Sequence, residues 1–222
     1  MLSKIINLLV VFLPWFLKKY ILVKFYGYEI SNDSRIGFSY IFPKKLILKN
    51  KAKIDHFNVV IHIQNFICDE NSYIGRNNWF TGHIGNIHFS HKKDRDPSFY
   101  LGKHASITKS HIFDCTDKIS IGSFTTVAGY RSQFLTHGIN YEGAYQDCKP
   151  ITIGNYCLIG TNVNVIGGSI LPDNCILSAS SFLNKNINHQ FQYHVIGGVP
   201  AKPLKSVDNQ SKYFNRVDGY IN

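Results

Sequence analysis

Aliphatic residues recur at every sixth position in the C-terminal half of the chain. From position 153 the sequence runs IGNYCL, IGTNVN, VIGGSI, LPDNCI and LSASSF, so the repeated residues are Ile153, Ile159, Val165, Leu171, Leu177 and Leu183. Four positions after each of the first five stands a small or medium residue: Cys157, Val163, Ser169, Cys175 and Ser181. This period fits neither an α-helix nor a coiled coil, but it fits short strands joined by tight turns, because alternate residues of a strand share a face. We expect Gly or Asn to supply the turn conformations.

The same spacing occurs earlier in the chain, with two polar interruptions. Leu101, Ile107 and Phe113 form one run, and Ile121 and Val127 form another. A less regular run comprises Ile36, Phe42, Leu48, Ile54, Val60 and Phe66. The interruptions cover residues 82–100 and 136–150. Loops of this length in a compact repeat are often functional, so we expect both to protrude near a site.

The N-terminus is apolar and basic. Apolar residues run from Ile5 to Leu17, broken only by Asn7 and Pro14, which predicts a short helix that is too short to cross a bilayer. No alanine precedes Ala52, and Lys18 and Lys19 stand where a signal-peptide cleavage site would require small residues. Two interpretations stay open: residues 1–24 make a peripheral contact with a membrane, or the helix packs on the protein.

Charge and cysteine usage narrow the class of protein. The net charge is +10, and residues 1–53 carry ten Lys or Arg against two acidic residues, Glu29 and Asp33. This excess favours an anionic partner, although no nucleic-acid-binding motif is present and we expect no nucleic acid. The five cysteines form no CxxC pair and are odd in number, which predicts free thiols and a reducing compartment. We therefore expect a cytoplasmic protein, at most in peripheral contact with the inner face of the cell membrane.

With GGVPAKPL at positions 197–204 behind them, the hexads resemble the hexapeptide-repeat acyltransferases. The apolar N-terminal segment followed by hexads is similar to polysaccharide-cluster O-acetyltransferases. The resemblance implies an all-β fold, a left-handed parallel β-helix with a short N-terminal helix and two protruding loops. It divides the chain into an N-terminal segment (1–34), a β-helix acyltransferase domain (35–205) and a C-terminal tail (206–222). It also implies a homotrimer that transfers an acetyl group from acetyl-CoA to a carbohydrate acceptor. No metal is expected in the reaction.

His137 is the candidate general base. An imidazole titrates near neutral pH, and His137 stands in FLTHGIN at the mouth of the second loop, before the PITIG hexad at 150–154. This context is similar to that of the base in galactoside and maltose acetyltransferases. The resemblance implies that His137 deprotonates a sugar hydroxyl, which attacks the thioester directly. Four side chains are candidates for orienting His137 or binding the acceptor: Asp114, Asp117, Tyr130 and Glu142.

The resemblance also assigns the acetyl-CoA contacts. The backbone amide of Thr161, after Gly160, corresponds to the family's oxyanion donor, and Ala179 corresponds to the alanine beside the pantetheine arm. Lys185, Lys202 and Lys205 lie where family members place basic side chains near the CoA phosphates, and a charged hydrogen bond to phosphate is strong.

Several alternatives stay open at this stage. Cys148 could act as a nucleophile, whereas Cys157 and Cys175 fall on inward positions. The spacing of His83 and His88 is similar to that of γ-type carbonic anhydrases, with His91, His56 or His62 as a third zinc ligand. The acceptor could instead be the amine of an amino sugar nucleotide. If His137 is not the base, His111 is the next candidate.

Overall fold

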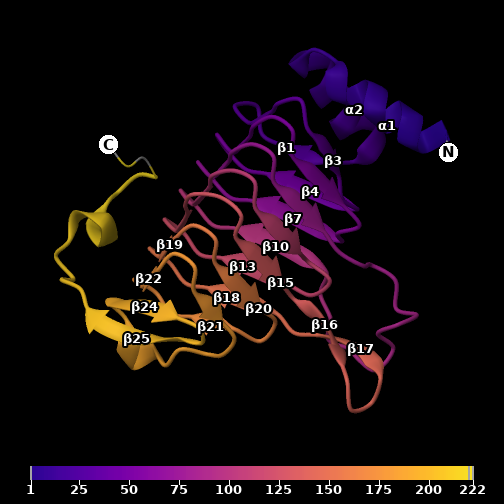
Figure 1. The fold of residues 1–222 in the computed structure, drawn as a ribbon. Coiled ribbons are helices and arrows are strands. Elements are labelled where there is room, and N and C mark those ends of the chain that lie inside the picture. The colour runs from indigo at the N-terminus through magenta and orange to yellow at the C-terminus, as the bar shows by residue number, and fades with distance from the viewer. Residues whose placement is uncertain (1, 220, 222) are drawn as a thin grey trace.

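The computed structural model describes residues 2–219 and 221, which wind into a parallel β-helix with three sheets. Sheet A contains β1 (Glu29–Ile30), β4 (Lys45–Leu48), β7 (Asn65–Cys68), β10 (Ser98–Leu101), β13 (Ile119–Ile121), β18 (Ile151–Ile153) and β21 (Ile170–Leu171). Sheet B contains β2 (Arg35–Ile36), β5 (Lys53–Ile54), β8 (Tyr73–Ile74), β11 (Ser106–Ile107), β14 (Thr126–Val127), β19 (Leu158–Ile159), β22 (Ile176–Leu177), β24 (His194–Gly198) and β25 (Ala201–Ser206). Sheet C contains β3 (Tyr40–Phe42), β6 (Val59–Ile61), β9 (Trp79–Thr81), β12 (Ile112–Asp114), β15 (Gln133–Leu135), β20 (Asn164–Ile166) and β23 (Phe182–Leu183). The chain visits the sheets in turn, so successive coils stack along the axis in Figure 1.

The predicted hexad positions form the core. The six repeated aliphatic residues from Ile153 to Leu183 and the five residues that follow them by four positions are all at most 1% exposed. Leu101, Ile107, Phe113, Ile121 and Val127 are also fully buried. The earlier run is wrong at one position, because Ile41 rather than Phe42 points inward from β3. The hydrophobic period therefore predicted the interior wherever it was unbroken.

Phenylalanines stack through the middle of this core. Phe113 lies parallel to Phe80 at 4.5 Å between ring centroids and to Phe134 at 4.7 Å. The three residues occupy paired positions on β9, β12 and β15. A parallel ladder brings identical positions of successive coils together, so one aromatic per coil builds a continuous column that packs tightly. This column supports the strands that lead into both long insertions.

The turns between sheets depart from the sequence expectation. Many of the turns contain a residue with positive φ, but among the fifteen non-glycine residues described with this conformation only four are Asn. At the edge between sheets A and B, His104, Phe124 and Tyr156 take this conformation, and their rings stack with centroids 4.9 and 4.6 Å apart. The left-handed region is costly for residues with a Cβ, and stacking between coils offsets that cost here.

Both polar insertions leave the β-helix at the edge between sheets C and A. The first connects β9 to β10, and the second, expected to be a loop, forms an antiparallel hairpin of β16 (His137–Asn140) and β17 (Tyr145–Cys148). Figure 1 shows the hairpin extending away from the stacked coils. The two insertions are held together: Lys92 Nζ lies 2.7 Å from Asp147 Oδ1, and the rings of His91 and Tyr145 contact at 4.8 Å. The hydrogen bond to Asp147 raises the pKa of Lys92.

Two helices cover the first coils: α1 (Leu2–Phe12) and α2 (Trp15–Tyr26). Pro14 separates them, and Gly27 ends α2 in the left-handed conformation with φ of 68°. The single predicted helix is therefore two, and β1 already lies within the predicted N-terminal segment. Within residues 2–219 and 221, no helix combines the length and apolarity needed to cross a membrane.

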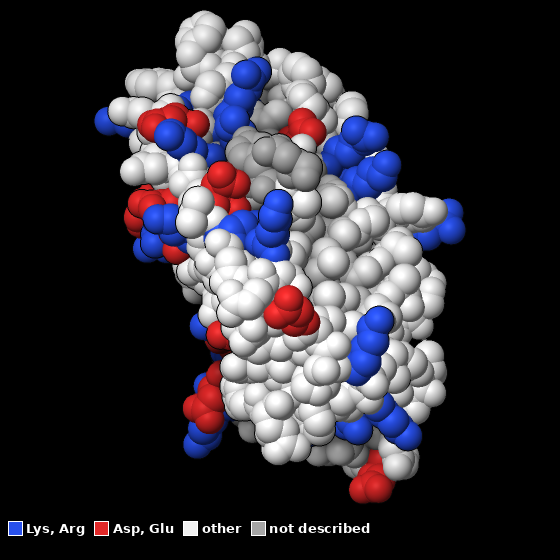
Figure 2. Space-filling model, turned by 90° about the vertical axis from the view of Figure 1, so that its left-hand side faces the viewer, with Lys and Arg blue, Asp and Glu red and all other residues white. Residues whose placement is uncertain are grey.

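After β25 the C-terminal tail returns along the edge between sheets A and B (Figure 1). It contains a short 3₁₀ helix (Lys212–Asn215), and a second one (His189–Phe191) precedes β24. The Tyr213 hydroxyl donates to the carbonyl of Cys157 at 2.8 Å, and the Gly219 amide donates to His104 at 3.1 Å. On the face shown in Figure 2, basic side chains are interspersed with acidic ones and separated by wide uncharged areas.

Candidate active site

His137 lies where the chain leaves sheet C and enters the hairpin. The preceding residue, Thr136, is 2% exposed, and its hydroxyl donates to the carbonyl of Asp114 at 2.7 Å while accepting the amide of Asp117 at 2.9 Å. These bonds tie the start of the hairpin to the coil before it. The His137 side chain itself is 38% exposed, so a fixed backbone presents an accessible imidazole.

Two polar side chains flank the imidazole. Asp114 Oδ2 lies 3.5 Å from His137 Nδ1, and Gln146 Oε1 contacts His137 Nε2 from across the hairpin. The other oxygen of Asp114 accepts from the amide and the hydroxyl of Thr116 at 3.0 and 2.6 Å, which fixes the carboxylate plane. A carboxylate beside Nδ1 favours the tautomer with the proton on Nδ1. Nε2 then carries the lone pair that a general base needs once an acceptor hydroxyl takes the place of the Gln146 oxygen, because that oxygen only accepts hydrogen bonds and cannot bond to an unprotonated Nε2.

His137 separates two cavities. The first, of about 350 Å³, lies toward the first insertion and is lined by His83, His88, Phe89, Asp114 and Gln146, among others. The second, of about 460 Å³, lies within the hairpin and against sheet C, and its walls include Tyr141, Glu142, Lys149 and Ile166. A base that borders two cavities can touch one reactant in each.

Arg95 organises the wall of the first cavity. Its guanidinium donates to the carbonyls of His83, Ile84, Gly85 and Thr116 and covers the ring of Phe89 at 4.6 Å. Phe89 is 3% exposed and meets the His137 ring edge to face at 5.9 Å. One half-buried cation thus satisfies the backbone of an irregular loop and holds an aromatic ring against the imidazole.

The other acidic and aromatic candidates lie elsewhere. Asp117 is buried, and its Oδ1 accepts the amides of Asp96 and Lys118 at 3.2 and 2.8 Å. Glu142 is exposed at the end of the hairpin. Tyr130 lies at the edge between sheets B and C, where its amide donates to the hydroxyl of Thr161 at 3.1 Å. Only Asp114 of the four predicted residues lies in contact with His137 in the described chain.

Gly160, Thr161 and Ala179 share the edge between sheets B and C. The Thr161 hydroxyl donates to the carbonyl of Tyr130 at 2.9 Å, which leaves Thr161 on the outside of the turn. A Cβ on Gly160 would lie 2.5 Å from the amide nitrogen of Ala179, so only glycine lets these two coils stack. Within one chain this edge and the edge that carries His137 lie on opposite sides of sheet C.

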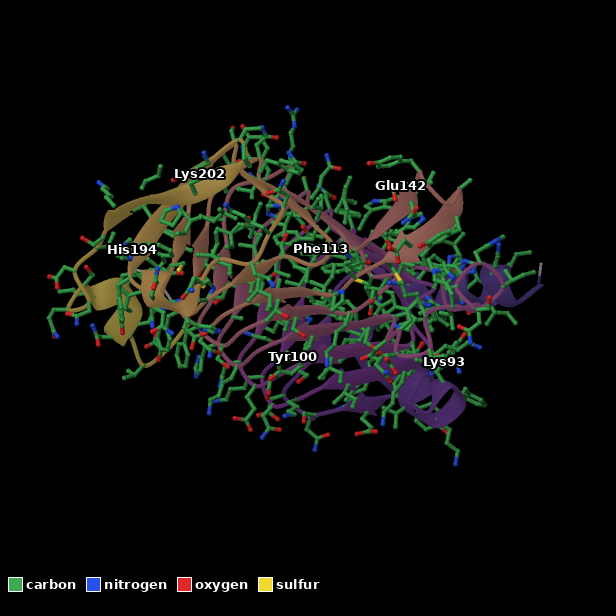
Figure 3. The ribbon with its side chains drawn as sticks, turned by 90° about the horizontal axis from the view of Figure 1, so that it is seen from below. Lys93, Tyr100, Phe113, Glu142, His194 and Lys202 are labelled. Carbon is green, nitrogen blue, oxygen red and sulfur yellow. The ribbon has the colours of Figure 1, made fainter. Side chains whose placement is uncertain are left out.

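The candidate phosphate-binding lysines lie toward the C-terminal end. Lys202 and Lys205 are exposed on β25, which pairs antiparallel with β24, and Lys185 is exposed in the turn after β23. None of the three forms an ion pair with a described carboxylate. Figure 3 shows Lys202 and Glu142 on opposite sides of the molecule. The small exposed Ala179 and these free cations fit the pantetheine arm and phosphates of CoA.

The structure corrects two alternative assignments. Cys148 is 3% exposed, and burial raises the pKa of its thiol to about 11, which does not suit a nucleophile. His111 is fully buried, with its ring between the Thr108 hydroxyl and the amide of Ser132, each at 3.1 Å. It cannot reach the cavities beside His137. Cys157 and Cys175 are buried, as predicted.

The histidines of the first insertion do not form a metal site. The rings of His83 and His88 lie 5.8 Å apart, and no group of three or more His, Cys, Asp or Glu among residues 2–219 and 221 is placed to hold a metal ion. Both side chains instead line the first cavity, together with Gln146, Phe89 and His137. The hexad phase gives no information on residues inside an insertion, so sequence reasoning missed Gln146, Phe89 and Arg95.

Comparison with known proteins agrees with this architecture. No protein-family model matches the chain. The sequence is 24% identical over 146 residues to the galactoside O-acetyltransferase of Escherichia coli (strain K12), a match that covers 64% of this chain and 66% of that enzyme. The chain thus matches slightly less than two thirds of that relative's length.

Solved structures share the fold at low sequence identity. The polysialic acid O-acetyltransferase OatWY has a TM-score of 0.61 at 18% identity, over 86% of this chain and 90% of that chain. AntD, an N-acyltransferase from Bacillus cereus in complex with dTDP and coenzyme A, has a TM-score of 0.52 at 11% identity, over 87% and 89% of the two chains. The hexads, the three parallel sheets and these similarities together identify the chain as a hexapeptide-repeat protein with the left-handed β-helix fold of the acyltransferases that it resembles.

Proposed function

We propose that the chain is an acetyl-CoA-dependent O-acetyltransferase that acts on a sugar hydroxyl in the biosynthesis of bacterial surface polysaccharide, with His137 as general base. The observation that carries the proposal is the accessible imidazole between two cavities, with Asp114 at Nδ1. The fold and the sequence similarity to a galactoside O-acetyltransferase support the reaction class.

In the proposed reaction His137 Nε2 accepts the proton of the acceptor hydroxyl as its oxygen attacks the thioester carbonyl. Bound acetyl-CoA supplies the activated acetyl group and a thiolate leaving group. The imidazolium stays beside the Asp114 carboxylate, which stabilises its positive charge, and then gives its proton to the departing sulfur. The backbone amide of Thr161 is the proposed donor to the developing oxyanion.

The cavity of about 350 Å³ is the proposed acceptor site. His83, His88 and Gln146 offer donors and acceptors for sugar hydroxyls, and Phe89 offers an apolar surface for a sugar face. His83 Nε2 is buried and has no hydrogen-bond partner among the described residues. An acceptor hydroxyl would satisfy it, because buried polar atoms are normally hydrogen-bonded.

The complete site is proposed to form between chains of a homotrimer. The outer surface of sheet C exposes Trp79 at 53% and Ile112 at 44%, which favours contact with another subunit. His137 and Thr161 lie on the two edges of that sheet. If sheet C of each chain packs around a threefold axis, the His137 edge of one chain faces the Thr161 edge of its neighbour.

Complementation between inactive chains tests this arrangement. His137→Ala removes the base, and Ala179→Trp blocks the proposed pantetheine contact on the opposite edge. Each variant alone should be inactive, whereas co-expressed chains should recover about one quarter of the wild-type activity, because random assembly pairs an intact His137 with an intact neighbouring edge at that frequency. Activity no higher than that of the single variants would place the whole site within one chain.

We also propose that residues 1–24 contact the membrane peripherally at the inner face of the cell membrane, where lipid-linked sugars are assembled. The exposed apolar residues of α1 and α2 support this location. Acetyl transfer to purified glycans, with hydroxyl acceptors compared against amino sugars, would separate O-transfer from N-transfer.

A further inference from the structure

The helical cap exposes many large apolar side chains. One side of α1 and α2 packs on the first coils through the buried residues Val10, Val11 and Leu22. The two helices also expose ten large apolar side chains, which we call the cap face, each between 41% and 73% exposed: Ile5, Ile6, Leu8, Leu9, Phe12, Phe16, Leu17, Tyr20, Val23 and Phe25. Apolar exposure on this scale marks an interaction surface. Figure 1 places α1 and α2 at one end of the β-helix, away from the hairpin.

A cavity of about 240 Å³ opens between this cap and the first coil. Aromatic side chains line part of it, among them Phe12 of the cap face, Trp15 and Phe38. The titratable side chains in its wall are Lys18, Arg35 and His56, and no carboxylate lines it. A partly open cavity with cations and no acid in its wall is suited to an anion.

Lys18 is the unusual member of this wall. It is 3% exposed, and its ammonium donates to the carbonyls of Gly37 at 2.6 Å and Val11 at 3.4 Å. An ammonium has three donors, so one has no acceptor among the described residues. No described carboxylate pairs with it, and burial lowers its pKa to about 8. A buried charge without a partner is costly, and an anion in the cavity would relieve that cost.

The other two titratable residues of the cavity wall differ in their hydrogen bonds and ion pairs. Arg35 is exposed on sheet B and forms no ion pair with a described carboxylate. His56 accepts the amide of Phe38 at Nδ1, and its Nε2 lies 3.3 Å from Asp55. The available cationic donors of the cavity are therefore those of Lys18 and Arg35.

We propose that this cavity binds the headgroup phosphate of an anionic phospholipid while the cap face lies in the membrane interface. The inference rests on the membrane contact proposed above and is independent of acetyl transfer. Phe12 belongs to both the cavity wall and the cap face, so a lipid whose phosphate meets Lys18 and Arg35 can lay its acyl chains along the exposed apolar residues.

Charge favours a lipid surface over a second copy of the cap. α1 and α2 contain four lysines and no acidic residue, so two caps face to face would repel each other. Anionic lipid attracts the same charge. In a trimer with parallel axes three caps face one side, which multiplies the strength of a weak single contact.

The test is sedimentation of the full-length protein with sucrose-loaded vesicles of phosphatidylcholine, with or without phosphatidylglycerol. Arg35→Gln is the cavity variant and Lys53→Gln its matched control, because Lys53 pairs with Arg35 in the next coil of sheet B but does not line the cavity. We expect binding to the anionic vesicles to fall about fivefold or more in Arg35→Gln and less than twofold in Lys53→Gln. Equal losses in the two variants would overturn the cavity as a headgroup site.

A second pair of variants tests the cap face. Leu9→Ser with Phe16→Ser removes two residues that are 63% and 70% exposed, and Val199→Ser with Val217→Ser removes two exposed residues distant from the cap. Only the cap pair should lose vesicle binding. If the cap pair instead changes the sedimentation coefficient and leaves vesicle binding intact, the face is a subunit contact and the proposal fails.

Inorganic phosphate separates a lipid site from a free-anion site. With sulfate as the ionic-strength control, phosphate at millimolar concentration should compete weakly with anionic vesicles. Saturable phosphate binding that is lost in Arg35→Gln, without any preference for anionic vesicles, would overturn the lipid assignment. None of these assays uses acetyl-CoA, so the two proposals can fail independently. A protein that transfers acetyl groups but does not bind anionic vesicles would contradict this inference and leave the proposed function unchanged.

Discussion

Asp114 Oδ2 lies 3.5 Å from His137 Nδ1, and the backbone fixes this relationship. Asp114 pairs with Leu135 in the parallel ladder of sheet C, and the hydroxyl of Thr136 bonds to the carbonyl of Asp114 at 2.7 Å. A carboxylate on one coil therefore meets the imidazole that leaves the next coil. Neither side chain has to move to make the contact.

Asp114→Asn tests this pairing. The substitution keeps the shape of the side chain but removes the negative charge that favours the imidazolium, so kcat should fall about 10- to 100-fold. The KM for acetyl-CoA should stay near its wild-type value, because Asp114 contacts His137 and not the proposed cofactor edge. Asp117→Ala is the control: it removes the acceptor of two backbone amides and should lower Tm with kcat mostly retained. An unchanged kcat in Asp114→Asn would remove Asp114 as a positioning residue.

Lys202→Ala tests the cofactor assignment. Lys202 is exposed and lies far from Glu142 at the hairpin in Figure 3, so its loss should leave the acceptor side intact. We expect the KM for acetyl-CoA to rise about 5- to 10-fold with kcat mostly retained, as for a lost phosphate contact. Lys212→Ala, an exposed lysine in the C-terminal tail, should change neither constant. A fall in kcat at saturating acetyl-CoA would contradict a binding role.

His111 predicts how stability depends on pH. Burial lowers its pKa to about 4, whereas an imidazole in the unfolded chain titrates near 6.5. Between these values the unfolded chain binds more protons, so the free energy of unfolding falls as the pH drops from about 6.5 to 4, by on the order of 3 kcal/mol from this residue. Urea unfolding at several pH values measures the loss.

His111→Asn is the matched variant, because an amide oxygen can accept the Ser132 amide in place of Nδ1. Its unfolding free energy should be lower than that of the wild type at pH 7.5, and the difference should shrink toward pH 4. A constant difference across this range would show that His111 titrates normally in the folded chain.

The hydrophobic period predicted the β-helix because burial in stacked coils requires it. Each coil repeats the same inward positions, so Ile153 to Leu183 could be assigned from spacing alone. The period failed at Phe42, where the turn before β3 is one residue shorter than the spacing assumes and Ile41 points inward. It also gave no account of turns in which Phe124 and Tyr156 adopt positive φ, because their stacking depends on the neighbouring coils.

The candidate site was predicted only where it touches the repeat. His137 and Asp114 flank repeat strands, so their positions followed from hexad phase and loop position. Gln146 reaches His137 through hairpin pairing, and Phe89 reaches it through the contacts of Arg95. Both depend on tertiary contacts of irregular segments, for which no local pattern exists.

Release of CoA thiol from acetyl-CoA in the presence of purified bacterial glycans tests the central claim most directly. The wild-type protein should release thiol only with an acceptor that gains an acetyl ester, and His137→Ala should reduce the rate about 10²- to 10⁴-fold with little change in acetyl-CoA affinity. The His137→Gln variant should behave alike, because an amide cannot take the proton. Acetylation of the identified acceptor by His137→Ala at the wild-type rate would contradict the assignment of His137 as the base.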